Sequence, residues 1–145
     1  MLVPSISGSI GAVLRPAGLE NAKGLIGAQW LKDPSDPRWS NDKDVRDYLE
    51  FAKTYLPGAN PEETAYAAGY MVANLMETIL RNCGDELTRE NVMKHATNLK
   101  DVPLMLGLPG VSYGNSSEDY NIIRNLQFVE FDGAKWLPFA AQADK

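Results

Sequence analysis

The order of the elements predicted along this sequence places it in the α/β class. An apolar segment at the N-terminus is followed by a helix and a second apolar segment. Amphipathic helices fill the middle of the chain, and two short strand-like segments flank an Asp-Gly turn near its end. The 145 residues are enough for an ordinary domain with a buried core.

The first part of the chain reads as strand, loop, helix and strand. Residues 9–15 carry Ile10, Val13 and Leu14 at helical spacing, and we expect Pro16 to end this helix because its ring clashes with the preceding turn. Residues 24–31 are an apolar run bounded by turn formers, which predicts a buried strand. The sequence DPSDP that follows predicts a rigid polar connector.

Three helices are predicted in the middle of the chain. The first runs over residues 42–55 and the third begins at Thr88. The second, over residues 60–81, has Asn60 as its N-cap and Pro61 at its first position. The residues expected to face inward are Val45, Tyr48, Leu49 and Ala52 in the first helix, Ala65, Ala68, Val72, Leu75, Met76 and Ile79 in the second, and Val92, Ala96 and Leu99 in the third.

The remainder of the chain favours strands. Residues 102–106 are apolar and compatible with a strand, and residues 107–120 form a connection rich in Gly, Ser and Asn. Residues 126–131 and 134–139 flank Asp132-Gly133, a typical signal of a two-residue hairpin.

Charge and composition disfavour several classes of function. The net charge is −5 and no Lys/Arg cluster occurs, so we expect neither nucleic acid nor an anionic membrane as partner. The uncharged stretch 64–76 is too short to span a bilayer, and no secretory signal is expected within these residues. The single Cys83 forms no internal disulfide.

Catalytic and metal sites are weakly indicated. The lone His95 is expected at a helix surface, and a single His and a single Cys exclude a His/Cys zinc site. The acidic residues between 33 and 44 fit a charged helix entry better than a calcium loop, because prolines interrupt them. We therefore expect no enzyme activity, no metal and no cofactor.

The loop SISGS at residues 5–9 allows three interpretations. A dinucleotide cradle is the weakest, because Ile6 stands where the first glycine is required. Ser and Gly can simply begin the helix, or Ser5, Ser7 and Gly8 can hold a ligand carboxylate or hydroxyl in a cleft. Tyr66 and Tyr70 share one helix face, where they either pack in the core or line a ligand pocket.

Six stretches of the chain together resemble one protein family. They are residues 7–18 (SGSIGAVLRPAG), 18–26 (GLENAKGLI), 33–39 (DPSDPRW), 69–70 (GY), 83–93 (CGDELTRENVM) and 131–136 (FDGAKW). They are similar to the branched-chain-amino-acid type of periplasmic solute-binding protein, the receptor subunit of ABC importers. Members of this family are much longer, so the resemblance implies the C-terminal portion of such a protein.

The resemblance implies a partial type I periplasmic-binding-protein fold, in which two lobes close around a ligand. Residues 1–31 would belong to the second lobe, residues 32–106 to the first, and residues 107–145 would return to the second lobe with the hairpin. Ser5, Ser7 and Gly8 would face the cleft from one lobe, and Tyr66 and Tyr70 from the other. Family members for amino acids carry an acid near Ser7, so a hydroxyl there favours an aromatic or other organic acid over an amino acid.

The function implied is a periplasmic receptor that delivers a small solute to a membrane permease. An incomplete pocket and uncovered sheet edges predict weak ligand binding and an oligomeric or strand-exchanged state for this chain. The alternatives are the ligand-sensing domain of a regulatory receptor with the same fold and, less favoured, a small Rossmann-like enzyme.

Overall fold

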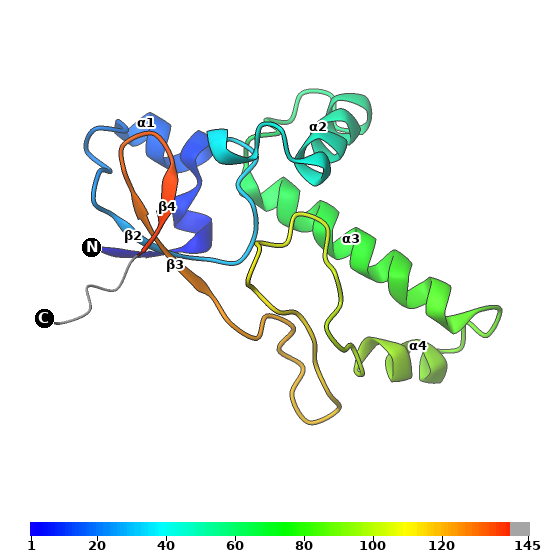
Figure 1. Cartoon of the computed structure of the whole chain (residues 1–145). Helices are drawn as coiled ribbons and strands as arrows, with labels where there is room; N and C mark the ends of the chain where they lie inside the picture. The colour runs from blue at the N-terminus through cyan, green and yellow to red at the C-terminus, as the bar shows by residue number, and fades with distance from the viewer. Residues whose placement is uncertain (140–145) are drawn as a thin grey trace, which may run out of the picture.

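The structure, a computed structural model, describes residues 1–139 and confirms the predicted α/β class. Figure 1 shows two parts: a small sheet covered by short helical turns, and a helical part from which the long helix α3 points away from the sheet. The N-terminus and the C-terminal hairpin both lie in the sheet part, although the whole helical part separates them in sequence. Among the described residues, no helix has the length and hydropathy needed to cross a bilayer.

The sheet contains four strands in the order β1-β2-β3-β4. Their bounds are Leu2–Pro4 for β1, Ile26–Gln29 for β2, Gln127–Phe131 for β3 and Trp136–Pro138 for β4. β1 and β2 are parallel, whereas the β2–β3 and β3–β4 pairs are antiparallel. A parallel pair from the start of the chain is therefore completed by a hairpin from its end.

Short helical turns lead from β1 to β2. A 3-10 turn (Ser5–Gly8) and a π-helical turn (Ile10–Leu14) precede α1 (Arg15–Ala17). The prediction that Pro16 ends the helix is wrong. Pro16 lies within α1, which continues directly from the π-helical turn, and the helix ends at Gly18, whose φ is 89°.

One face of the sheet packs on these turns. Ile10 and Leu14 lie in a buried cluster with Val129, Phe131 and Trp136. The rings of Phe131 and Trp136 pack at a tilt, with 5.3 Å between their centroids. The strands are too short to be stable alone, so this cluster supplies the apolar burial that holds the sheet part together.

Two of the three predicted helices form as expected. α2 (Lys43–Tyr55) is capped by Asp42, and Val45, Tyr48 and Ala52 are buried as predicted. α4 (Arg89–Ala96) is capped by Thr88. Its predicted inward residues Val92 and Ala96 pack against a buried cluster of the helical part that consists of Leu75, Ile79, Cys83 and Leu99.

The second predicted helix, α3 (Thr64–Cys83), forms with a different start. Its predicted inward residues Leu75 and Ile79 are buried, whereas Val72 and Met76 are exposed, so the buried face is shifted from the predicted one. Asn60 is not its N-cap: the Asn60 side chain accepts from the Glu62 N–H at 3.1 Å in the preceding turn, and Glu63 holds the N-cap position. The buried residues are Thr64, Ala67, Met71, Leu75, Ile79 and Cys83. Because α3 is apolar on two sides, its pattern did not determine which side packs inward.

Two local predictions near the C-terminus are also wrong. Residues 102–106 form no strand: the described part of this region contains only isolated bridges, at Leu31–Gly107 and Tyr113–Ile123. The hairpin loop has four residues rather than two, since Phe131 pairs with Trp136. The Asp132 carboxylate closes this loop by accepting from the N–H groups of Ala134 and Lys135.

The connector after β2 joins the sheet part to the helical part. The Asp33 carboxylate accepts from the N–H of Ile10 at 2.8 Å, and the Ser35 hydroxyl accepts from the N–H of Gly11 at the same distance. On the other side, the Lys32 N–H donates to the carbonyl of Leu106 at 2.8 Å. The rigid connector predicted from DPSDP thus anchors the first helical turn of the sheet part.

Candidate functional site

An open hollow lies where the sheet meets the connecting segments. It has a volume of about 730 Å³ and opens to solvent. We call it the junction pocket. Its lining residues are Pro4, Ser5, Ile6, Ala28, Trp30, Ile123, Arg124, Asn125, Leu126 and Phe128. They come from the carboxyl ends of the parallel strands β1 and β2 and from the chain that enters β3, and this edge is where open α/β sheets bind ligands.

Apolar side chains dominate the lining of the junction pocket. Ile6 is 66% exposed, Phe128 52% and Leu126 47%, so a large part of this surface is open to a ligand. Trp30 contributes an aromatic side chain from the segment after β2. A pocket of this composition binds the apolar body of a small organic molecule, while its few polar groups orient that molecule.

Ser5 is one of these polar groups. Its hydroxyl donates to the Gln29 Oε1 at 2.8 Å, which leaves the oxygen lone pairs free to accept. Gln29 is itself buried, and its Nε2 has no hydrogen-bond partner within residues 1–139. The Ser5–Gln29 bond links the loop after β1 to the end of β2, and so determines the position of the Ser5 side chain.

Arg124 supplies the positive charge. Its Nη1 donates to the Asp119 carboxylate at 2.7 Å and to the carbonyl of Asn121 at 3.0 Å. The hydrogen bond from Arg124 lowers the pKa of Asp119, so that carboxylate stays ionised. Both contacts use the Nη1 nitrogen of the guanidinium. Its other N–H donors match the geometry of a ligand carboxylate.

Gly8 has a packing role in the structure. Its carbonyl accepts from the Trp136 Nε1 at 3.0 Å in the buried sheet part. A Cβ at this position would lie 2.7 Å from the Gln29 Nε2 and 3.0 Å from the Trp136 ring. The structure therefore explains why glycine stands here without a ligand, and Gly8 does not line the junction pocket.

The other predicted ligand residues lie in different places. Ser7 is half-buried. It follows Ser5 and Ile6 in the sequence, but unlike them it does not line the junction pocket. Tyr66 lies near the start of α3 and is 40% exposed. Tyr70 packs on Tyr48 and Phe51, with centroid separations of 5.4 and 4.9 Å. Of the predicted site residues, Ser5 alone lines this pocket, and the ligand roles of the rest stay predictions.

Sequence reasoning missed most of the pocket lining. The sequence places Trp30 in the predicted buried strand 24–31 and Phe128 in the predicted strand 126–131. Arg124 gives no local signal, because it lies in an irregular segment. Alternation along the predicted hairpin strand was the usable clue: Val129 and Phe131 are buried, so Phe128 must lie on the opposite face.

Comparison with known proteins gives a structural match. No family model matches the sequence, and no curated protein does. The fold is similar to that of a crystal structure described as a branched chain amino acid ABC transporter from Thermus thermophilus with bound valine, with a TM-score of 0.75 and 17% sequence identity. The match covers 96% of this chain and 37% of that chain.

The chain has part of a periplasmic-binding-protein fold. It spans little more than a third of the length of the Thermus thermophilus protein. This likeness establishes the architecture, a sheet part and a helical part joined by connecting segments, and the partial fold expected from the sequence is confirmed. The junction pocket lies at the place where these connecting segments leave the sheet.

The connecting segment also contains the most buried charges of the region. Burial raises the pKa of the Asp33 carboxyl above its ordinary 3.8, against the hydrogen bonds from Ser35 and Ile10. Lys32 is buried as well, and its ammonium donates to Asp42 at 2.8 Å and to Asp44 at 3.1 Å. Within residues 1–139 no group of three His, Cys, Asp or Glu side chains is arranged to hold a metal ion.

Proposed function

We propose that this chain binds a small organic solute and acts as the receptor component of an ABC importer. The observation that carries the proposal is the junction pocket, an open apolar hollow at the carboxyl ends of parallel strands. Its position agrees with the general rule for ligand sites in α/β sheets. The similar protein from Thermus thermophilus, which carries bound valine, supports the same role.

The solute that fits the lining is a carboxylic acid with an apolar body. Arg124 can take the carboxylate, and Trp30, Phe128 and Ile123 can enclose the apolar part. Among the residues lining the pocket, all in the described part of the chain, none is acidic, and the Asp119 carboxylate beside it is paired with Arg124. This favours an aromatic or other organic acid over a branched-chain amino acid, which is the second candidate ligand.

Capture would proceed by movement of the two parts about the connecting segments. In this proposal residues 1–31 and 107–145 belong to one lobe and residues 32–106 to the other, with Ser7, Tyr66 and Tyr70 approaching the ligand on closure. A receptor of this kind works in the periplasm, passes its solute to a membrane permease and performs no catalysis.

A thermal-shift and calorimetric screen of the purified chain tests this function. The panel contains aromatic carboxylates, aliphatic carboxylates, valine, leucine and nicotinamide nucleotides. We expect binding of an aromatic or aliphatic carboxylate, weaker binding of the amino acids and none of the nucleotides. Binding of nucleotides alone would overturn the proposal, and so would the absence of binding by every acid in the panel at millimolar concentration.

A further inference from the structure

α3 presents a second apolar surface in addition to its buried face. Val72 is 60% exposed, Met76 46% and Leu80 40%. With three small exposed residues they form a continuous stripe along the helix, which we call the outer stripe: Ala65, Gly69, Val72, Ala73, Met76 and Leu80. A contiguous apolar stripe that is exposed along a helix marks an interaction site.

The outer stripe is complementary to itself in the antiparallel direction. If two antiparallel copies of α3 cross between Val72 and Ala73, two residues lie opposite each other when their numbers add up to 145. Ala65 then faces Leu80, and Gly69 faces Met76 of the second copy, so each large side chain meets a small one. Val72 and Ala73 form the central layer in the same way. Alternating large and small residues at facing positions is the arrangement that lets two helices pack closely.

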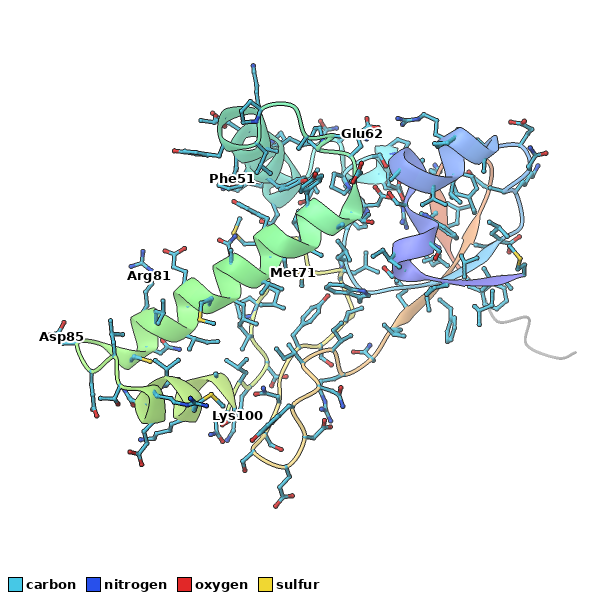
Figure 2. The ribbon with its side chains drawn as sticks, turned by 180° about the vertical axis from the view of Figure 1, so that it is seen from behind. Phe51, Glu62, Met71, Arg81, Asp85 and Lys100 are labelled. Carbon is cyan, nitrogen blue, oxygen red and sulfur yellow. The ribbon has the colours of Figure 1, made fainter. Side chains whose placement is uncertain are left out.

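The charges at the two ends of α3 agree with this direction. Arg81 lies near the C-terminal end with its side chain 76% exposed and donates to the Glu77 carboxylate of its own helix at 2.7 Å, and Glu63 occupies the N-cap position. Figure 2 shows the adjacent Glu62 and Arg81 at opposite ends of the helix. In an antiparallel pair, Arg81 of each copy lies opposite the N-terminal turn and Glu63 of the other. The helix dipoles also oppose each other favourably.

The exposed area of the chain is large for its size. The solvent-accessible surface is 9045 Å², whereas a compact protein of 16.0 kDa exposes about 7400 Å². The whole chain therefore exposes roughly 1600 Å² more than a compact protein of this mass. A protein–protein interface of standard size covers about 800 Å² on each partner.

We propose that the outer stripe binds a second copy of this chain, forming a twofold dimer through antiparallel packing of α3 on α3. A hollow of about 540 Å³ beside Met76, Leu80 and Leu87 lies level with Tyr66 of the second copy and accepts its ring. The dimer interface is separate from the junction pocket, which no residue of the outer stripe lines. The inference therefore does not depend on the proposed function.

Sedimentation equilibrium of the purified chain tests the dimer. We expect the mass of a dimer at tens of micromolar protein, and we expect Met76→Asp to weaken association by about 100-fold or more because it places a charge at the centre of an apolar interface. Leu2→Asp is the matched control, since Leu2 is also exposed but lies on the sheet. A monomeric wild-type chain, or a dimer abolished by Leu2→Asp and not by Met76→Asp, would overturn the proposal.

A charge exchange provides a second test that does not depend on core packing. Arg81→Glu and Glu63→Arg should each weaken self-association by roughly tenfold or more, because like charges then face each other at both ends of the interface. A mixture of the two variants should form a heterodimer, since each contact again joins opposite charges. Undiminished self-association of both single variants would contradict antiparallel packing, as would failure of the mixture to associate.

Discussion

The indole N–H of Trp136 donates a 3.0 Å hydrogen bond to the carbonyl of Gly8, 128 residues earlier in the chain. Trp136 is 1% exposed, so this bond lies in the core of the sheet part. It joins the C-terminal hairpin to the loop after β1, the same loop that supplies Ser5 to the junction pocket. The hairpin is thus a structural support of the candidate site.

Replacing Trp136 tests this support. We expect Trp136→Phe to lower the free energy of unfolding by about 2 to 4 kcal/mol, because it removes buried volume and leaves the Gly8 carbonyl without its donor. Urea denaturation followed by circular dichroism measures the loss. A change below about 0.5 kcal/mol, the range of ordinary surface substitutions, would show that the hairpin does not stabilise the loop.

Gly8→Ala should destabilise the chain by about 1 to 3 kcal/mol through overpacking, since the new Cβ would lie 3.0 Å from the buried Trp136 ring and 2.7 Å from the Gln29 Nε2. Ser7→Ala is the neighbouring control, and we expect it to change the unfolding free energy by less than about 0.5 kcal/mol. Equal stability of the two variants would contradict the packing role of Gly8.

The pocket lining predicts a specific change in ligand preference. Arg124→Gln should weaken binding of a carboxylate ligand by about tenfold or more and leave binding of its neutral amide analogue unchanged, because the lost interaction is a charge-assisted hydrogen bond. Arg46→Gln on the exposed face of α2 makes the same charge change away from the pocket. Calorimetric titrations that show equal losses for the acid and the amide would remove Arg124 from the site.

Asp42 gives a prediction for stability at low pH. Partial burial raises the pKa of Asp42, but the hydrogen bonds from Lys32 and the Val45 N–H outweigh it, so that the pKa lies below the ordinary 3.8. The carboxylate therefore stabilises the fold above pH 3.8, and this contribution is lost as the pH falls through the lowered folded-state pKa. Asp42→Asn keeps the helix cap and removes the ion pair.

The wild-type chain should exceed Asp42→Asn in unfolding free energy by about 1 kcal/mol at pH 6, and the difference should vanish in strong acid. Asp42→Ala should lose about 1 kcal/mol more at both pH values, because it also removes the cap. Denaturation curves from pH 2 to pH 6 measure these differences. A gap between wild type and Asp42→Asn that stays constant with pH would exclude the ion pair as its source.

Asp33 should show the opposite dependence on pH. Burial raises the pKa of the Asp33 carboxyl in the folded state above 3.8. The native chain therefore keeps this proton up to a higher pH than the unfolded chain does. Stability attributable to Asp33 therefore falls as the pH rises from 3.8 through the raised pKa, and is constant above it. The difference between wild type and Asp33→Asn should decline over that window. A difference in unfolding free energy between the two proteins that stays constant with pH would rule out this titration.

The α/β class, α2 and α4 with their approximate bounds, the existence of α3 and the terminal hairpin were all predictable from the sequence. These features depend on local rules: apolar spacing, capping residues such as Asp42 and Thr88, and an Asp-Gly turn. The tertiary structure decided which side of α3 is buried, because both sides are apolar and only the packing of the surrounding segments distinguishes them. It also brought Ser5, Trp30 and Arg124 together, since parallel strands and a returning hairpin unite residues that no local pattern relates.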